Sequence, residues 1–349
     1  MECYATMQEI ACLFPYLDKS GEYLFARGIT LESALNSDHI VKRAIDIVEE
    51  SLKRMKNRPC VDEPEVEAAA SRLALYIITG ASNIYLLRRF ADSQSKMFTY
   101  RLRNTPGIQS YECKAEIASD LGLSVAMARN VVKGSLLAAT YPIAIRWRDY
   151  IRYAPQDPDW AMINRPVVSG WVLLDVNDFE RVLEDAYEAK ILKMASREDV
   201  GYIVGLLSKV EPIYREIAKL RSLRPVTIRA EGRGEDPPCM RAIIESIRKG
   251  ENAPHTARFA ITTYLLRRGW DVEQIVDLFR SSPDFNEKIT RYQVQHIAGQ
   301  VGGRKEYSVP SCETMNSWGL CPTNLGCGVK NPVQYGRRAS RATEASRPQ

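Results

Sequence analysis

Apolar side chains recur every three to four residues over four stretches of the chain, which is the spacing of one face of an α-helix. The clearest stripe covers residues 37–56 and follows the capping candidates Ser37 and Asp38. Its apolar positions are Val41, Ala44, Ile45, Val48, Leu52 and Met55. The other three stretches cover residues 73–97, 114–139 and 179–192. The N-terminal part is therefore predicted to be mostly helical.

One segment, residues 161–174, interrupts this helical pattern. Val167-Val168 and Trp171-Val172 flank the pair Ser169-Gly170. Two short apolar runs separated by two such residues are typical of a β-hairpin with a tight turn. We therefore expect a small sheet to be inserted in the N-terminal helical domain.

Local composition predicts where the domains end. Residues 221–238 combine Arg, Pro and Gly with charges of both signs and no apolar period, which is typical of a linker. We place the boundary near residue 220, between an N-terminal domain (1–220) and a C-terminal domain (221–336). Residues 337–349 are rich in Arg, Ser, Ala and Pro without an apolar anchor, and are expected to form a disordered basic tail.

The overall composition is that of a soluble globular protein, with 45% hydrophobic and 26% charged residues. The most apolar stretch, residues 73–87, is broken by Thr79, Ser82 and Asn83, so neither a signal peptide nor a membrane span is predicted. We expect a cytoplasmic protein. Disulfides are then unexpected among the eight cysteines, and metal ligation becomes the leading explanation for any cysteine cluster.

Positive charge is concentrated in the C-terminal part. Residues 221–349 contain 20 Lys and Arg against 13 Asp and Glu, whereas residues 1–220 contain 28 against 30. Such asymmetry favours a polyanionic partner for the C-terminal part, because Lys and Arg neutralise phosphates and release counterions. A solvated basic surface without a partner remains the alternative.

Four cysteines, Cys239, Cys312, Cys321 and Cys327, lie in the C-terminal part, three of them in loop-like sequence rich in Pro, Gly and Asn. Four thiolates can complete a tetrahedral site for Zn²⁺ or hold a [4Fe–4S] cluster, and the spacing does not decide between them. The alternative is four unrelated buried thiols. That alternative is preferred for the other four cysteines, Cys3, Cys12, Cys60 and Cys113, which are scattered.

A helix is predicted from Pro254 to Arg268, with Asn252 as its capping candidate and Gly269 as its stop. His255 and Arg258 share its first turn, beside free backbone N–H groups and the positive end of the helix dipole. This combination suits a phosphate or triphosphate. Local capping by His255 and an ordinary surface charge at Arg258 are the alternatives.

A second helix is predicted over residues 286–297, where Tyr292 and His296 lie four residues apart on one face. Their rings could stack on a base or hold a nucleotide. The alternative is that Ile289 and Tyr292 pack in the core.

The C-terminal part contains a series of short motifs. In order they are Pro237-Pro238-Cys239-Met240-Arg241, residues 252–259 (Asn-Ala-Pro-His-Thr-Ala-Arg-Phe), Pro283-Asp284-Phe285, residues 290–297 (Thr-Arg-Tyr-Gln-Val-Gln-His-Ile), Pro310-Ser311-Cys312, Cys321-Pro322, Cys327 and Asn331-Pro332. This series resembles the iron–sulfur domain of archaeal and eukaryotic DNA primase large subunits. In the N-terminal part, residues 84–91 and 161–174 resemble the helical body and small sheet of the same family.

The resemblance implies a mainly α fold with an inserted β-hairpin (α+β) subdomain and an all-α C-terminal iron–sulfur domain. It implies that Cys239, Cys312, Cys321 and Cys327 hold a [4Fe–4S] cluster. It also implies that His255 and Arg258 contact the template strand and the primer.

The function that the resemblance implies is that of a regulatory subunit without polymerase chemistry. The N-terminal domain would bind a catalytic small subunit, and the C-terminal domain would bind single-stranded DNA template, RNA primer and the initiating nucleotide. The aromatic run Tyr141, Trp147, Tyr150, Tyr153 and Trp160 is the candidate docking surface, since aromatic anchors favour interfaces.

Other functions stay open as alternatives: an iron–sulfur or zinc DNA-repair protein acting alone, or a zinc-bearing transcription or scaffold protein. A catalytic role is not predicted for any residue. Asp157-Pro158-Asp159 is a short carboxylate pair in a Pro-rich connection, and turn chemistry explains it better than metal binding.

Overall fold

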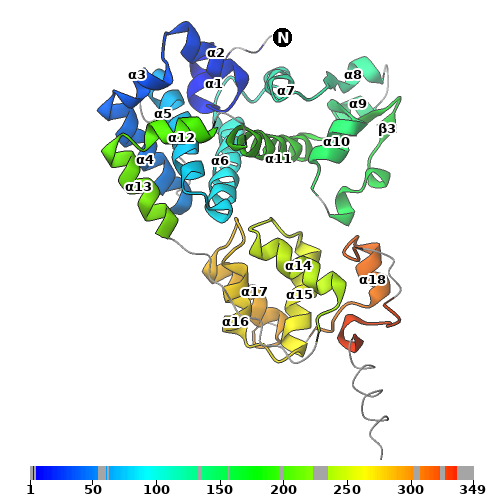
Figure 1. The fold of residues 1–349 in the computed structure, drawn as a ribbon. Helices are drawn as coiled ribbons and strands as arrows, with labels where there is room; N and C mark the ends of the chain where they lie inside the picture. Colours follow the sequence, from blue (N-terminus) through cyan, green and yellow to red (C-terminus); the bar gives the residue numbers. More distant parts are fainter. Residues whose placement is uncertain are drawn as a thin grey trace, which may run out of the picture. The chain divides into compact units, whose positions relative to one another are not determined.

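In the computed structural model the chain divides into two compact units, Met1–Leu223 and Arg224–Gln349 (Figure 1). The structure describes residues 3, 5–53, 60, 63–132, 136–155, 157–196, 200–222, 235–301, 307–322 and 327–335. Most of the predicted linker (223–234) and the whole predicted tail (337–349) therefore lie outside the described residues.

Helices build most of the first unit (Figure 1). The helices of its main body are α1 (Met7–Leu13), α2 (Asp18–Ala26), α3 (Leu31–Leu35), α4 (Asp38–Lys53), α5 (Pro64–Gly80), α6 (Ile84–Asn104), α7 (Tyr111–Asp120), α11 (Val176–Ala195), α12 (Val200–Leu207) and α13 (Glu211–Ser222). The mostly helical character predicted for this unit is confirmed.

Helix α4 forms where the clearest apolar stripe predicted it, although Met55 lies outside the described residues. Its buried face also contains Arg43, whose Nε and Nη2 donate to the Glu67 carboxylate of α5 at 2.8 and 2.9 Å. A buried guanidinium needs such a bidentate partner, because an unpaired charge in the core is strongly destabilising. This ion pair fixes how α4 lies on α5.

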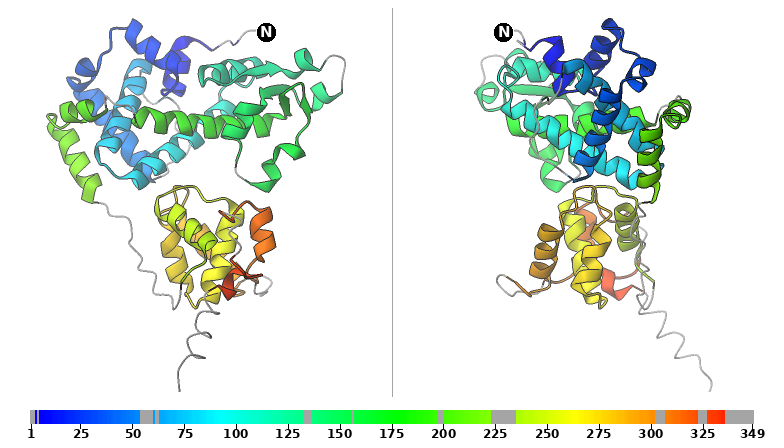
Figure 2. Two further views of the ribbon diagram at one scale, coloured as in Figure 1. Left: turned by 45° about the vertical axis from the view of Figure 1, so that its right-hand side comes forward. Right: turned by 90° about the vertical axis from the view of Figure 1, so that its left-hand side faces the viewer.

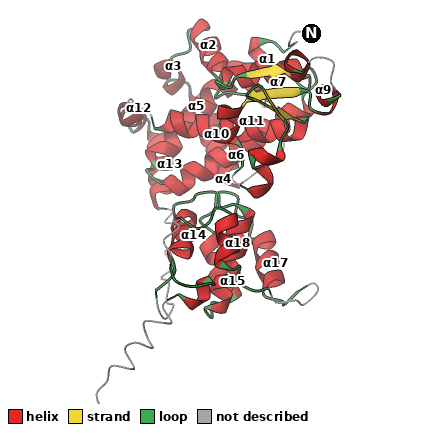
Figure 3. Ribbon diagram, turned by 90° about the vertical axis from the view of Figure 1, so that its right-hand side faces the viewer, coloured by secondary structure: helices red, strands yellow, loops and turns green. Residues whose placement is uncertain are grey.

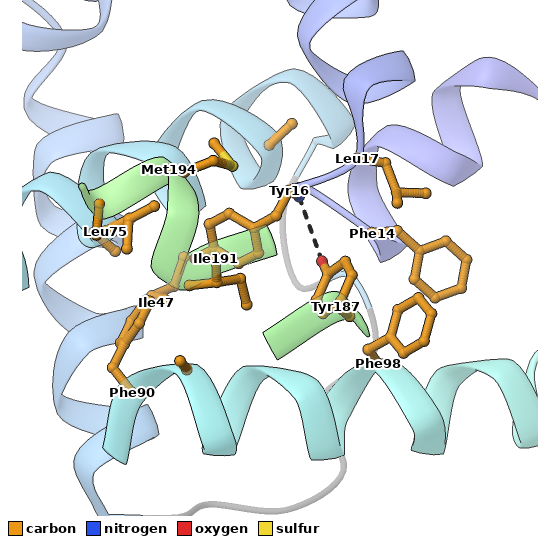
Figure 4. Close-up of a cluster of buried hydrophobic side chains, with 14 of the residues drawn as sticks. Phe14, Tyr16, Leu17, Ile47, Leu75, Phe90, Phe98, Tyr187, Ile191 and Met194 are labelled. Atoms are coloured by element: carbon orange, nitrogen blue, oxygen red, sulfur yellow. Dashed lines mark hydrogen bonds between the residues drawn. The ribbon is translucent and has the colours of Figure 1, made fainter. Parts of the chain in front are cut away.

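The centre of the helical body lies between α6, α11 and the segment that follows α1 (Figure 4). Phe98 of α6 stacks on Tyr187 of α11 with ring centroids 4.2 Å apart, and Phe14 contacts Phe98 edge to face at 5.1 Å. The Tyr187 hydroxyl accepts a hydrogen bond from the backbone N–H of Tyr16 at 3.4 Å. Helix α11, predicted over residues 179–192, is thereby confirmed as a core helix.

The stripe over residues 73–97 belongs to two helices and not to one. The chain turns at Ser82, whose φ of 54° is left-handed and ends α5. The Asn83 side chain then accepts from the Leu86 N–H and caps α6. The apolar period continues on both sides of this break, which is why periodicity alone concealed it.

Residues 114–139 do not form the predicted continuous helix. After α7 the chain enters β1 (Val125–Met127), followed by two short helices, α8 (Ala128–Val131) and α9 (Leu137–Thr140), and by β2 (Ile143–Arg146). The strands are only three and four residues long. Such short apolar runs carry too little period to separate strand from helix.

The sheet has four antiparallel strands in the order β1-β2-β4-β3 and lies at one side of the first unit (Figure 3). Its hairpin consists of β3 (Val167–Val168) and β4 (Trp171–Leu174), as predicted. The turn residues Ser169 and Gly170 have φ values of 49° and 77°, which is the type I′ turn that matches strand twist. The prediction missed β1 and β2, which make the other half of this sheet.

Helix α10 (Trp147–Tyr153) and the 3₁₀ turns η1 (Pro158–Trp160) and η2 (Met162–Asn164) complete the β subdomain. Arg165 ties these pieces together, since its Nε donates to the Tyr150 hydroxyl at 3.0 Å and its Nη1 pairs with Asp178 at 2.6 Å. The hydroxyl of Tyr150 in turn donates to the Trp160 carbonyl at 2.7 Å.

The second unit consists of helices and loops in the part of it that the structure describes (Figure 2). Its elements are α14 (Pro238–Arg248), α15 (His255–Arg267), α16 (Val272–Phe279), α17 (Glu287–Ile297), α18 (Cys312–Ser317) and the 3₁₀ turn η3 (Pro332–Gln334). Its core is separate from that of the first unit and surrounds Met240, Ile261 and Ile275. The all-α prediction agrees with these elements.

The four scattered cysteines do not remain unrelated thiols. Cys3 pairs with Cys113 and Cys12 pairs with Cys60, each pair as a disulfide. The prediction was wrong because partners 110 and 48 residues apart in sequence meet only through the tertiary fold.

Among the helices that the structure describes, none combines the length and the apolar character needed to cross a membrane.

Candidate functional site

A pocket of about 420 Å³ lies in the second unit, lined by residues of α15 and α17, by Phe279 of α16 and by Tyr307. Its volume falls within the range of small-molecule sites, about 300–1,000 Å³. The lining side chains are His255, Arg258, Phe259, Thr262, Phe279, Thr290, Tyr292, Gln293, Val294, His296, Ile297 and Tyr307. All four residues predicted to bind nucleic acid or nucleotide, His255, Arg258, Tyr292 and His296, thus line one pocket.

The N-terminus of α15 has no side-chain cap. Its N-cap residue is Pro254, which offers no side-chain acceptor to the N–H groups of the first turn. Asn252 does not cap the helix as predicted, because its Oδ1 accepts from Arg258 Nη2 at 2.8 Å instead. First-turn N–H groups without a protein acceptor, together with the helix dipole, favour an anion at this end.

Arg258 of α15 is held in place by three acceptors. Its Nε donates to the Ala253 carbonyl at 2.8 Å, and its Nη2 donates to Asn252 Oδ1 and to the Asp284 carboxylate. These contacts tie the loop before α15 to the Pro283-Asp284-Phe285 motif. Nη1 makes no hydrogen bond or ion pair with the described residues and keeps its donor capacity.

His255 is exposed, and Tyr292 keeps 57% of its surface accessible. Ile289 is 56% exposed, so the alternative in which Ile289 and Tyr292 pack in the core is excluded. The Tyr292 and His296 rings lie 6.3 Å apart with an angle of 33° between their planes. One accessible ring beside a half-buried one suits stacking on a planar base.

Three aromatic side chains near this site were not predicted. Tyr307 lies 5.8 Å from the His296 ring and 5.6 Å from the Phe259 ring, and Phe259 lies 6.4 Å from Trp318 at the end of α18. Phe259 directly follows Arg258 in the motif of residues 252–259, and this adjacency was the available signal in the sequence. Through these contacts the pocket wall is continuous with the helix that begins at Cys312.

Two of the four candidate metal ligands occupy helix N-termini. Cys239 is the second residue of α14, behind an N-cap proline without a side-chain acceptor, and Cys312 is the first residue of α18. Cys321 and Cys327 lie in the loops that follow, and all four are free of disulfides. Helix N-termini stabilise thiolates, which are the form that binds metal.

Neighbouring thiols influence Cys239 and Cys312 electrostatically. Burial raises the pKa of Cys239 to about 11; a hydrogen bond from the Met240 N–H lowers it, and nearby Cys321 and Cys312 raise it further. Burial also raises the pKa of Cys312, and Cys327 and Cys321 add to that increase. Thiolates so placed repel one another unless a cation compensates their charge.

This donor set fits a thiolate-bound metal centre in residue type. Among the described residues, however, no three Cys, His, Asp or Glu side chains stand together as a formed metal-binding group. Residues 323–326, between Cys321 and Cys327, lie outside the described part.

A polar clamp anchors the segment before Cys239. The Tyr264 hydroxyl of α15 donates to Asp236 Oδ1 at 2.8 Å, and Arg268 Nη2 lies 3.9 Å from the same atom. Burial and this contact with Asp236 raise the pKa of Tyr264, so the phenol stays protonated and remains a donor. The clamp fixes the start of α14, and with it Cys239, against α15.

The remaining sequence candidates lie in the first unit. The Asp157 carboxylate accepts from the Asp159 N–H at 3.1 Å, which is a local turn and confirms the turn interpretation. Of the proposed docking aromatics, Trp147 is 41% exposed but Tyr150 is only 1% exposed. Tyr150 therefore holds the β subdomain together and cannot anchor a partner, contrary to the prediction.

Comparison with known proteins defines the class. Residues 25–199 match the family model of the eukaryotic and archaeal DNA primase large subunit N-terminal domain, and residues 231–338 match that of its C-terminal domain. The chain therefore belongs to the family of eukaryotic and archaeal DNA primase large subunits.

Individual relatives support this assignment over most of the chain. The DNA primase large subunit PriL of Methanocella arvoryzae is 30% identical over 94% of this chain and 88% of its own length. PriL of Methanococcoides burtonii is 27% identical over 93% and 90%. PriL of Methanopyrus kandleri reaches 51% identity over 105 residues, which are 30% of this chain and 26% of that protein.

Proposed function

We propose that this chain is the regulatory subunit of a cytoplasmic DNA primase, and that its pocket holds the initiating nucleotide and template for a catalytic small subunit. The observation that supports this most is the convergence of His255, Arg258, Tyr292 and His296 on one pocket. The chain itself supplies no polymerase chemistry in this proposal. Its contribution is positioning, which raises the effective concentration of the first nucleotide.

Each part of the pocket has a role in this scheme. The uncapped N–H groups of α15, with His255 and Nη1 of Arg258, bind the phosphates of the nucleotide. Tyr292 and His296 stack on a base. Asp284 offsets part of the positive charge of Arg258. The affinity for phosphate therefore comes both from the N–H groups at the end of α15 and from the guanidinium of Arg258.

Dinucleotide synthesis by the reconstituted pair of subunits tests this role. His255→Ala and Arg258→Ala are each expected to raise the nucleotide concentration that initiation requires, while extension of a preformed primer changes less. Thr290→Ser, a conservative change in the same pocket, serves as the matched control. Unchanged initiation at limiting nucleotide in both variants would refute the assignment.

We further propose that Cys239, Cys312, Cys321 and Cys327 hold a [4Fe–4S] cluster. When bound, the cluster compensates the thiolate charge and cross-links α14, α18 and the loops that carry Cys321 and Cys327. Visible absorption and iron content of anaerobically purified protein separate this proposal from a zinc site. Cys321→Ser should lose iron and lower the stability of the second unit; an unchanged, folded C-terminal unit would rule out a structural cluster.

For the partner surface we propose the exposed face of α10. Trp147 and Ile151 lie four residues apart there and are 41% and 56% exposed, beside the exposed Arg148 and Arg152. Trp and Arg are favoured at the centres of protein interfaces. Trp147→Ala with Ile151→Ala should reduce co-purification with the small subunit, whereas Tyr202→Ala, an exposed control on α12, should not. Co-purification unaffected by the double substitution would dispose of this surface.

A further inference from the structure

Two disulfides enclose the first helix of the chain. Cys3 precedes α1 and pairs with Cys113 in the first turn of α7, while Cys12 lies within α1 and pairs with Cys60 ahead of α5. The Cα atoms of the pairs are 4.5 and 5.9 Å apart, within the range of about 4.4–6.8 Å that a disulfide spans. Helix α1 is thus tied on both sides to different parts of the helical body.

The segment that these ties enclose is part of the core. We call residues 5–17 the N-terminal plug. Phe14, Tyr16 and Leu17 are fully buried, and they meet Phe98 and Tyr187 in the centre of the helical body (Figure 4). If the plug left its place, the buried rings of Phe98 and Tyr187 that it covers would become exposed to water.

The plug has little helical stability of its own. Helix α1 has seven residues, and helices shorter than about 12–15 residues are marginal in water without tertiary support. The polar anchors of α1 include the capping box between Thr6 and Glu9 and a hydrogen bond from Arg101 Nη1 to the Leu13 carbonyl at 2.6 Å.

The residues that follow α1 are held more firmly, because Arg72 Nε and Nη2 donate to the carbonyls of Pro15 and Leu17 at 3.0 and 2.8 Å, and the Tyr16 hydroxyl donates to the Ser71 carbonyl at 2.9 Å. A chain terminus stays ordered only where such contacts hold it, so once the two covalent ties are cut we expect opening to begin at α1 and to proceed toward residue 17.

We propose that the two disulfides are redox-sensitive ties that keep the N-terminal plug in the helical body, and that their reduction lets the plug open while the rest of the chain stays folded. Each tie forms by exchange with a low-molecular-weight or protein disulfide. Two cysteine thiols lose two electrons and two protons, and the donor disulfide becomes two thiols.

The burial of the four sulfurs determines which sulfur of each disulfide an incoming thiolate attacks. Cys12 and Cys113 are 1% and 0% exposed, whereas Cys3 and Cys60 are half-buried. An attacking thiolate therefore reaches Cys3 or Cys60 first, and the buried partner leaves as the thiol. The eight cysteines then serve two separate purposes, since the four of the second unit remain free thiols available to a metal.

The first test maps the pairing chemically. The full chain, equilibrated with oxidised glutathione and alkylated after denaturation, should yield cross-linked peptides that join Cys3 to Cys113 and Cys12 to Cys60, with the C-terminal cysteines alkylated. Free thiols at these four positions, or randomly mixed pairs, would overturn the proposal.

The second test measures opening. Hydrogen exchange of the backbone amides of residues 10–17 should accelerate at least tenfold when dithiothreitol is added, while exchange in α11 changes little. The double variants Cys3→Ser/Cys113→Ser and Cys12→Ser/Cys60→Ser should each show part of this acceleration without reductant. Equal rates of hydrogen exchange in the plug of the oxidised and the reduced protein would refute the proposal that the disulfides hold the plug in place. Neither test depends on primer synthesis, so the outcome is independent of the proposed function.

Discussion

Arg258 and Asp284 allow a test in which two substitutions act in opposite directions on nucleotide binding. Arg258→Ala removes the charged donor, and Asp284→Asn keeps a hydrogen-bond acceptor for Arg258 but removes the competing negative charge. The two side chains are 22% and 26% exposed, so either change should cost about 1 kcal/mol of stability in the second unit. Stability alone would therefore not distinguish them.

Binding does distinguish the two variants. A hydrogen bond to a charged group contributes about 1.5–3 kcal/mol, so Arg258→Ala should raise the half-saturating concentration of initiating nucleotide about ten- to hundredfold. Asp284→Asn should leave it unchanged or lower it, because the guanidinium charge is no longer offset. Dinucleotide synthesis by the reconstituted pair, with thermal unfolding as a control for folding, measures both.

The alternative makes a different prediction for the same pair. If Arg258 serves only to tie Asn252 and Asp284 together, both substitutions loosen the same loop and should weaken nucleotide binding to a similar extent. Equal losses in Arg258→Ala and Asp284→Asn would therefore refute a direct phosphate contact.

Three further predictions concern stability. Burial, with Asp92 and Asp185 nearby, raises the pKa of Glu188 to about 8. The stabilising contribution of the protonated Glu188 side chain is complete below about pH 4.5 and is lost as the pH rises through 8. Glu188→Gln should therefore flatten this loss of stability in denaturant titrations at pH 5, 7 and 9. Tyr264→Phe removes the hydrogen bond to Asp236 and should lower the free energy of unfolding by about 1–3 kcal/mol. The same variant should lose iron to a chelator faster than the unaltered protein. Iron retained equally well by both proteins would argue against the clamp. Glu67→Gln leaves Arg43 buried with its main partner uncharged and should cost about 3–5 kcal/mol by chemical denaturation; a loss below 1 kcal/mol would contradict the buried pair.

Long amphipathic helices were predictable because their apolar period is strong. The stripes of α4 and α11 fall on buried faces, and the Ser169-Gly170 turn follows from the need for left-handed backbone at both positions. A break between two helices was not predictable where the apolar period continues across it, as at Ser82 between α5 and α6. Nor were the short strands β1 and β2, because β1 is held by pairing with β2, and β2 by pairing with β4, and not by local preference.

The candidate site was predictable as a set of residues but not as a place. The sequence predicted that His255 and Arg258 share one helical turn and that Tyr292 and His296 share another. It did not predict that these two helices form one pocket. The role of Asn252 was wrong because a tertiary contact with Arg258 replaced the local cap. The disulfides escaped prediction for the same reason, since their partners meet only in the folded chain.

The most direct test of the central claim is the rate of dinucleotide formation by the small subunit as a function of initiating nucleotide, measured with and without this chain. The account predicts that the chain alone forms no product and that its addition lowers the half-saturating nucleotide concentration. Product formed by the chain alone, or initiation by the small subunit that is indifferent to the chain, would contradict it.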